Sequence, residues 1–228
     1  MNLRQFSQKA LEKIFEACKG HTIMHTDTGA GIVLRHDVDD HFDKSYRCSL
    51  LQDKYGIRAA YYILNTAPYW GEHFDLMRDM QDRGHEIGWH NDALSEWVQD
   101  TSQDIEGIIR SPIEKLRSEG LNIKGTVGHG NKLCYEHKFI NHQIWRCAND
   151  TTPDLIHTSE KFPGIGNKRF SLSDFGLEYD GMLNIKKDYY ASESGKNWFK
   201  KDITALIEKT KKEKKRLIIL IHPQHWSI

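Results

Sequence analysis

Short runs rich in apolar residues alternate along the chain with longer stretches in which apolar residues recur at helical spacing. The short runs, bounded by polar and turn residues, predict buried strands. These predicted strands are residues 31–39, 58–64, 85–90, a short segment near 125–127, and 217–221. The longer stretches predict helices. These predicted helices are residues 2–19, about 43–55, about 72–83, a longer stretch that ends at Gly120 and is broken or kinked at Pro112, and about 197–214.

Strand, helix, glycine and strand follow one another in this order, which is typical of βαβ units and a parallel sheet. The sequence therefore predicts an α/β protein. Residues 150–195 are rich in Gly, Ser, Asp and Tyr, and their pattern assigns no elements. Because no linker, fixed-period repeat or low-complexity tract interrupts the chain, we expect a single domain over residues 1–228.

Charge and hydropathy exclude several classes of protein. The 32 Lys and Arg residues balance the 32 Asp and Glu residues, so no global basic field would attract nucleic acid or an anionic membrane. The longest apolar runs, residues 59–64 and 217–221, are far shorter than the roughly 20 residues of a membrane span. The amino-terminal segment lacks the apolar region of a secretory signal, and the four cysteines show no CxxC spacing. We therefore expect a cytoplasmic protein with reduced, mostly buried thiols.

Two carboxylates end the first predicted strand. Asp37 and Asp39 share one face of an extended strand, because side chains alternate there. Neighbouring carboxylates repel each other unless one binds a cation or the two have different roles. A polar loop with a helix-capping aspartate would account for Asp40 or Asp43, but it leaves Asp37 and Asp39 unexplained. We therefore interpret this pair as functional.

Three histidines follow other predicted strands. His90 ends the strand at 85–90, His129 lies between two glycines after the strand near 125–127, and His222 follows the last strand. His85, five positions before His90, faces the other way in a strand, and we expect it to be structural. Parallel α/β sheets place their active sites at the carboxyl ends of strands. The histidines and the two aspartates are therefore expected together at the carboxyl ends of the strands.

Such a set of residues supports metal-assisted hydrolysis. A divalent ion held by an aspartate and neutral imidazoles lowers the pKa of a bound water from ~16 toward 7. A second carboxylate can take the proton of the water, and a separate histidine can protonate the leaving group. Mixed nitrogen and oxygen ligands suit Zn²⁺ and also admit Fe, Co, Ni or Mn.

These segments occur together in a known family. The sequence resembles the polysaccharide deacetylase superfamily (NodB-homology, carbohydrate esterase 4), and most closely a cytoplasmic branch whose first strand carries an R-H-D-V-D signature. The matching segments sample nearly the whole chain in order. They are RHDVDD (35–40), GIRAAYYI (56–63), GHEIGWHND (84–92), GHG (128–130), SDFG (173–176), ASESGKNW (191–198) and LIILIHPQHW (217–226).

The resemblance implies a distorted (β/α)7-type barrel of parallel strands, the NodB-homology fold, and hydrolysis of an amide, commonly the N-acetyl group of an amino sugar. On the matching positions, it implies that Asp37 is the general base and Asp39 the metal-binding aspartate. It likewise implies that His90 is the first histidine of the metal-binding pair and His222 the general acid.

One position departs from the pattern of the superfamily. Its second metal-binding histidine lies four residues after the first, and Leu94 occupies that position here. His129 is our preferred third ligand, because it falls where the arginine–proline motif of the family lines the same site. Asp92, two residues past His90, and a water molecule are the alternatives.

Three further residues are candidates for substrate binding. Trp89 and Trp226 adjoin the proposed site residues and offer flat faces that can stack on a sugar ring. Arg35 precedes Asp37 by two positions, so it could instead orient Asp37 or pair with a surface carboxylate.

The sequence therefore predicts a metal-dependent deacetylase, with Zn²⁺ as the expected cofactor. The expected substrate is an N-acylated sugar or glycan precursor, nucleotide-linked or lipid-linked, in surface-polysaccharide or O-antigen-type biosynthesis. One alternative is the same chemistry on a small non-sugar amide. The other is a non-catalytic glycan-binding relative, motivated by Leu94 and opposed by the intact Asp37, Asp39, His90 and His222.

Overall fold

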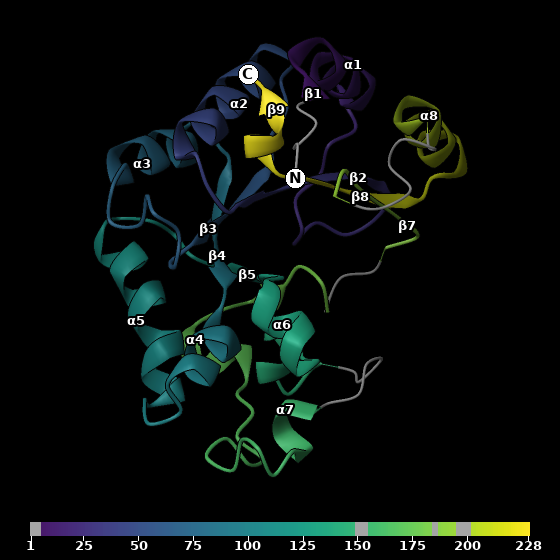
Figure 1. The fold of residues 1–228 in the computed structure, drawn as a ribbon. Helices are drawn as coiled ribbons and strands as arrows, with labels where there is room; N and C mark the ends of the chain where they lie inside the picture. Colours follow the sequence, from purple (N-terminus) through teal and green to yellow (C-terminus); the bar gives the residue numbers. More distant parts are fainter. Residues whose placement is uncertain (1–5, 149–154, 184–186, 195–201) are drawn as a thin grey trace. The chain divides into compact units, whose positions relative to one another are not determined.

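The computed structural model of the protein describes residues 6–148, 155–183, 187–194 and 202–228 (Figure 1). The chain forms two compact units. The first unit comprises Met1–Ile63, Ala67–Ile87 and Lys186–Ile228. The second comprises Leu64–Thr66 and Gly88–Ile185. The single domain expected from the sequence stays a prediction.

Seven strands form a sheet in the order β6-β5-β4-β3-β2-β8-β7. In the first unit β3, β2, β8 and β7 pair in parallel, and in the second unit β4, β5 and β6 do so. The predicted parallel α/β class is confirmed, with the strand number of a (β/α)7-type fold. The strands are β2 (Gly31–Val38), β3 (Ala60–Leu64), β4 (Glu86–Asn91), β5 (Gly125–Gly128), β6 (Tyr179–Asp180), β7 (Tyr189–Ser192) and β8 (Arg216–Ile221).

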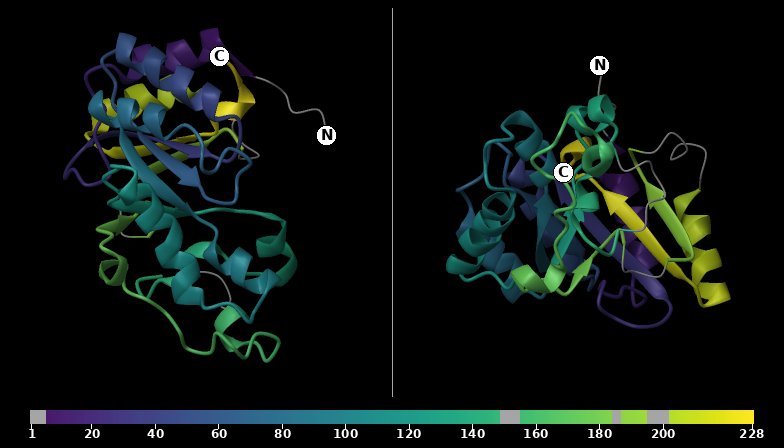
Figure 2. Two further views of the ribbon diagram at one scale, coloured as in Figure 1. Left: turned by 90° about the vertical axis from the view of Figure 1, so that its left-hand side faces the viewer. Right: turned by 90° about the horizontal axis from the view of Figure 1, so that it is seen from below.

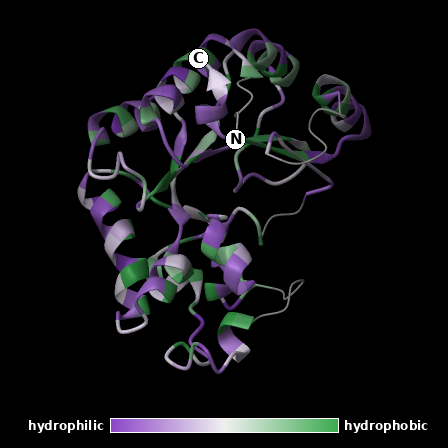
Figure 3. Ribbon diagram, in the orientation of Figure 1, coloured by the Kyte–Doolittle hydropathy of each residue, from purple (hydrophilic) through white to green (hydrophobic). Residues whose placement is uncertain are grey.

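The first unit is built on β2 and β8. Every residue of β8 is buried, and so is every residue of β2 after Gly31. Parallel sheets are covered on both faces, which favours continuous apolar runs such as Leu217–Ile221 of β8 (Figure 3). The register pairs His36 with Ile221, so the chain segments that follow β2 and β8 leave the sheet at the same edge. This register brings the segment after Val38 close to the segment that begins at His222.

Four long helices belong to the first unit. Two of them, α1 and α8, pack against each other on one side of β2 and β8 (Figure 2). The start of α1 is capped by the Ser7 hydroxyl, which accepts a hydrogen bond from the Ala10 N–H at 3.3 Å. Its buried residues recur at helical spacing, which gives one apolar face. These helices are α1 (Gln8–Cys18), α2 (Phe42–Lys54), α3 (Phe74–Asp82) and α8 (Ile203–Glu213).

A two-stranded parallel sheet joins the ends of the described chain in the first unit. It pairs β1 (Phe6–Ser7) with β9 (Trp226–Ser227), directly after the short 3₁₀ turn η4 (Pro223–His225). Neither two-residue strand was predicted, because so short a segment shows no periodicity.

The second unit carries the remaining helices. They are α4 (Ala93–Gln99), α5 (Ile105–Ser118), α6 (Lys132–His137) and α7 (Leu155–Thr158), with the 3₁₀ turns η1 (Asn141–Ile144) and η2 (Leu172–Phe175). Among the described residues, no helix combines the length and the apolar composition that crossing a membrane requires.

The predicted break of the helix at Pro112 is wrong, and the kink given as its alternative stays a prediction. The long helical stretch divides at residues 100–104 instead, and Pro112 lies buried within α5. The physical reason is the cap of α5: the Asp104 carboxylate accepts hydrogen bonds from the N–H groups of Glu106 (3.3 Å) and Gly107 (3.0 Å). A strong cap at a polar turn therefore decides where this helix begins.

Other predicted elements agree with the structure to within a few residues. The last helix begins at Ile203 after the capping residue Asp202, and residues 197–201 of its predicted range lie outside the described residues. The same holds for residues 195–198 of the matching segment 191–198. Three of the four cysteines are buried, as expected.

Candidate active site

Asp37 is held by an arginine from its own strand. Arg35 and Asp37 lie on the same face of β2, as strand alternation predicts. Arg35 Nε donates to Asp37 Oδ1 at 2.7 Å, and a terminal nitrogen donates to Oδ2 at 2.5 Å. Both side chains are almost completely buried. This two-pronged pair fixes the plane of the carboxylate. Of the roles left open for Arg35, this geometry fits orientation of Asp37.

A buried glutamate holds His222. Glu193 directly follows β7, and its Oε1 accepts a hydrogen bond from His222 Nδ1 at 2.9 Å and another from the His222 backbone N–H. The Nδ1 atom of His225 lies 3.4 Å from the same oxygen. The sequence analysis did not single out Glu193, because its region showed no periodicity. Its position within the matching segment 191–198 was the one available signal.

The charges of these groups decide where the proton lies. Burial acts to lower the pKa of His222, but the hydrogen bond and charge of Glu193, with the charges of Asp37 and Asp39, outweigh burial and raise the pKa to about 9. Burial acts to raise the pKa of Glu193, and its hydrogen bonds to His222 and His225 lower it to about 2. At neutral pH His222 is therefore an imidazolium that can donate a proton.

Asp39 lies in a different environment from Asp37. Its Oδ2 accepts a hydrogen bond from Gln224 Nε2 at 3.1 Å and lies 3.7 Å from His222 Nε2. Its side chain keeps 27% exposure, whereas that of Asp37 keeps 5%. The first unit thus brings Asp39 and His222 together, with Asp39 the more accessible of the two aspartates.

The alternative interpretation, in which an aspartate caps the next helix, does not apply. The residue before α2 is His41, which adopts a left-handed conformation (φ 51°) and makes no side-chain capping bond. Asp40 accepts a hydrogen bond from the His41 N–H, and Asp43 lies within the first turn of α2.

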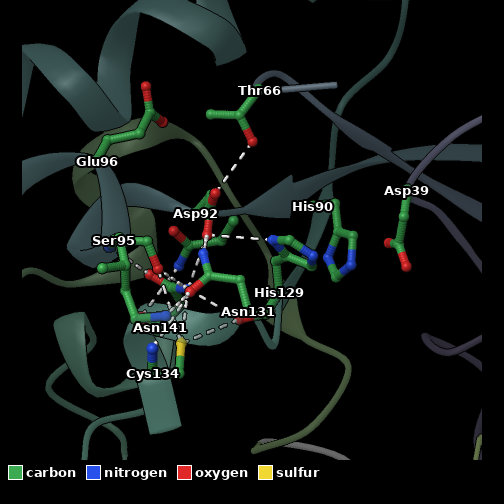
Figure 4. Close-up of polar contacts among 12 residues, drawn as sticks. Asp39, Thr66, His90, Asp92, Ser95, Glu96, His129, Asn131, Cys134 and Asn141 are labelled. Carbon is green, nitrogen blue, oxygen red and sulfur yellow. Dashed lines mark hydrogen bonds and ion pairs between the residues drawn. The ribbon is translucent and has the colours of Figure 1, made fainter. Parts of the chain in front are cut away.

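Two histidines are neighbours in the second unit. His90, near the end of β4, and His129, directly after β5, have ring centroids 5.0 Å apart (Figure 4). The Nδ1 atom of His90 lies 3.0 Å from the Val127 carbonyl oxygen. Because a carbonyl oxygen only accepts, Nδ1 carries the proton in this contact, and Nε2 is then the nitrogen that can act as a ligand. The Nδ1 atom of His129 lies 3.2 Å from Asp92 Oδ1, which favours the same tautomer.

This donor set fits a divalent transition metal. Neutral imidazoles that present Nε2, each with an acceptor at Nδ1, are the usual protein ligands of zinc. Leu94, which replaces the second histidine of the family pattern, is completely buried in α4. In the second unit, His129 is therefore the histidine that accompanies His90.

The two tryptophans proposed for substrate stacking are buried in the structure. Trp89 is 0% exposed, and its indole N–H donates to Asn65 Oδ1 at 2.8 Å. Trp226 is 1% exposed and stacks on Phe6 at a ring-centroid distance of 4.7 Å. A ring that stacks on sugar needs an exposed face, so we assign both indoles to packing.

His85, which the sequence predicts to be structural, is buried in the first unit, and so is His36. His36 stacks on Tyr61 at 4.3 Å. His85 accepts a hydrogen bond from the Ala59 N–H at 3.3 Å, and its Nε2 lies 3.2 Å from Asp53.

The fold and these residues define a parallel α/β protein with carboxylate and histidine clusters at the carboxyl ends of its strands. No protein-family model matches the chain, and no curated protein matches it at a significant level.

Three solved structures are similar to this chain. The catalytic domain of peptidoglycan N-acetylglucosamine deacetylase from Eubacterium rectale has 14% identity and a TM-score of 0.44, and the match covers 87% of this chain and 81% of that one. The chitin deacetylase from Colletotrichum lindemuthianum has 15% identity and a TM-score of 0.44, with 91% and 79% covered. A mutant of the peptidoglycan deacetylase PdaC from Bacillus subtilis has 15% identity and a TM-score of 0.39, with 86% and 76% covered.

Proposed function

We propose that the protein is a metal-dependent hydrolase that removes an acyl group, most simply N-acetyl, from an amino sugar. One observation in the first unit carries the proposal: Asp37 is held by Arg35, and His222 is held as an imidazolium by Glu193. Amide hydrolysis needs a proton acceptor for the attacking water and a proton donor for the leaving nitrogen. In this proposal, the Asp37 carboxylate is the proton acceptor and the His222 imidazolium is the proton donor.

Asp37 acts as the general base in this proposal. Although Arg35 binds both oxygens, a carboxylate has about four acceptor sites, so it can still take a proton from water. The arginine keeps the carboxylate in one orientation, which matters because proton transfer requires a distance of about 2.6–3.2 Å.

His222 acts as the general acid. The leaving nitrogen of an amide must be protonated, and the Nε2–H of His222 is the available donor because Nδ1 is engaged by Glu193. When the C–N bond breaks, the proton moves from Nε2 to the amine, and the ring becomes neutral. The next cycle restores the imidazolium from solvent, since Glu193 keeps the protonated ring favourable.

The predicted metal ligands are Asp39, His90 and His129, with Zn²⁺ as the expected ion. This ligand set rests on the resemblance of the sequence to the deacetylase superfamily, and the orientation of the two imidazoles supports it. When bound, a divalent ion would polarise the substrate carbonyl and acidify a water molecule. The chain itself supplies the acceptor Asp37, the donor His222 and the groups that orient them.

The sugar assignment rests on the resemblance of the sequence. We propose an N-acetylated sugar or glycan precursor in surface-polysaccharide or O-antigen-type biosynthesis, within the cytoplasm. With Trp89 and Trp226 assigned to packing, the proposal does not rely on stacking.

The test combines metal content with a substrate screen. We expect about one zinc or other transition metal ion per chain, and acetate release from nucleotide-linked or lipid-linked N-acetyl sugars. Hydrolysis confined to small non-sugar amides would contradict the sugar assignment and favour an amidohydrolase that acts on such amides. A protein that binds no metal after reconstitution and releases no acetate would contradict the catalytic proposal and favour a glycan-binding relative.

A further inference from the structure

The second unit contains a buried carboxylate, Asp92, behind the ring of His129. Asp92 directly follows β4 and is 5% exposed. Although it stands at the cap position of α4, its side chain makes no capping bond to that helix. Instead, Asp92 Oδ1 lies 3.2 Å from His129 Nδ1. The sequence left Asp92 open as a metal ligand, and the structure gives it another partner.

Three donors surround the Asp92 carboxylate. Oδ1 accepts hydrogen bonds from Asn131 Nδ2 at 2.7 Å and Asn141 Nδ2 at 3.0 Å, and Oδ2 accepts one from Thr66 Oγ1 at 3.0 Å (Figure 4). The donors come from three separate segments of the unit, so they fix the orientation of the carboxylate. Two amide donors and the imidazole nitrogen of His129 all lie at Oδ1, so this oxygen is surrounded by groups of the protein itself.

The orientation of both asparagine amides follows from their other contacts. Asn131 caps α6, where its Oδ1 accepts hydrogen bonds from two backbone N–H groups at 2.9 and 3.2 Å. Asn141 Oδ1 accepts a hydrogen bond from the Ser95 N–H at 3.1 Å. Because each amide oxygen is committed to the backbone, each Nδ2 must face Asp92. The side chain of Asp92 is therefore an acceptor from both.

The same network holds the backbone of His129. Asn141 Nδ2 also lies 2.8 Å from the His129 carbonyl oxygen, and the His129 N–H donates to the Asn91 carbonyl at 2.8 Å. Asn141 is completely buried. Both the main chain and the ring of His129 are thus constrained by buried polar groups.

We propose that Asp92 is a positioning residue for His129: it accepts the Nδ1 proton, so that Nε2 stays available as a metal ligand, and Asp92 itself does not bind the metal. This inference rests on the proposed function, in which His129 is a ligand. The Nδ1 atom of His90 faces a neutral carbonyl oxygen, whereas that of His129 faces a carboxylate, and a carboxylate partner raises the basicity of a ligating imidazole.

The first experiment measures zinc affinity by competition with a chelator in the full-length protein. Loss of an outer carboxylate behind a ligating histidine typically weakens metal binding 10–100-fold, and we expect Asp92→Asn to fall in this range. Glu96→Gln is the matched control, because this carboxylate lies on α4 of the same unit and accepts a hydrogen bond from Asn65. We expect Glu96→Gln to bind zinc as the wild type does.

Two affinity results would overturn the inference. If Asp92→Asn binds zinc as tightly as Glu96→Gln, the carboxylate does not act through His129. If Asp92→Asn loses zinc as completely as His129→Ala, Asp92 is itself a ligand.

The second experiment reads the tautomer of His129 in metal-free protein from its side-chain ¹⁵N shifts. We expect the proton on Nδ1 in the wild type and a mixture of tautomers in Asp92→Ala, with Asp92→Asn as the substitute if the alanine variant fails to fold. An unchanged tautomer in the variant overturns the inference. A wild type with the Nδ1 proton but no zinc affinity supports the Asp92–His129 contact and contradicts the proposed function instead.

Discussion

Asp37 and Asp39 show how two identical side chains two residues apart acquire different properties. Asp37 is buried against Arg35, whereas Asp39 contacts Gln224 and His222 and is partly exposed. A buried carboxylate with a fixed arginine partner is suited to a constant orientation, and an accessible one to a cation. The different environments, rather than the residue type, support the two proposed roles.

Replacing each aspartate by asparagine tests this assignment. We expect Asp37→Asn to lower kcat by about 10²–10⁴-fold while metal content is kept, because the base is lost and no ligand is. We expect Asp39→Asn to lose the metal. Metal per chain and kcat are measured on the same preparations, with Asp40→Asn as the control, since Asp40 is about half exposed. Normal turnover and metal content in both variants would contradict the roles.

Glu193 controls the proton of His222. Glu193→Gln keeps a side chain of the same shape with an oxygen that can accept the hydrogen bond, but it removes the negative charge. Burial then lowers the pKa of His222 with less opposition, and we expect this pKa to fall well below about 9. An NMR titration of the metal-free protein measures this pKa. If it stays near 9, the aspartates rather than Glu193 hold the proton.

At the scale of elements, caps and registers determine where site residues emerge. The pairing of β2 with β8 places the segments after Val38 and Ile221 at one edge, which brings Asp39 near His222. In the second unit the pairing of His90 with Val127 places His129 two residues beyond, beside the His90 ring. Within each unit, parallel pairing thus places the polar residues that follow neighbouring strands close together.

The cap of α5 is testable by itself. Removing the carboxylate in Asp104→Ala leaves the N–H groups of Glu106 and Gly107 without their partner. We expect the free energy of unfolding to fall by about 1 kcal/mol. Asp104→Asn should restore most of it, because asparagine is an equally good cap. Urea unfolding of the three proteins measures the difference, and an alanine variant as stable as the wild type would show that the cap contributes nothing.

At the scale of the whole molecule, buried neutral histidines link stability to pH. Tyr61 donates its hydroxyl to Gln52 Oε1 at 2.6 Å, so Gln52 Nε2 must face His36 Nε2, 3.1 Å away, as a donor. His36 is therefore neutral, and burial lowers its pKa to about 3. A proton on His36 Nε2 would place this N–H donor against the amide N–H donor of Gln52.

The expected consequence is acid sensitivity of the fold. The unfolded chain binds the proton near pH 6.5 and the folded chain only near pH 3, so stability is present above pH 6.5 and is lost as the pH falls through this window. At pH 5 the loss from this one histidine is about 2 kcal/mol. Urea unfolding at pH 7.5 and pH 5 should show a smaller difference for His36→Gln than for the wild type, and equal differences would contradict the assignment.

Much of the strand order was accessible from the sequence, because apolar periodicity is a local property. The strands at 31–39 and 217–221 were predicted from their own residues, and the structure places β2 and β8 there. In contrast, β6 and β7 lie within residues 150–195, where the Gly-, Ser-, Asp- and Tyr-rich sequence shows no apolar period. The break before α5 was not predicted, because proline is the usual helix breaker and the Asp104 cap leaves no mark on the apolar pattern.

The sequence by itself determined the parallel α/β class and singled out Asp37, Asp39, His90, His129 and His222, because strand alternation and strand ends are properties of neighbouring residues. Only the tertiary structure decided which groups face them. Glu193 is 29 residues from His222, and the Asn141 amide that holds Asp92 is 49 residues away. Such contacts depend on how separate segments meet, and no local pattern encodes them. The charge on His222 and the orientation of His129 therefore depend on the tertiary structure.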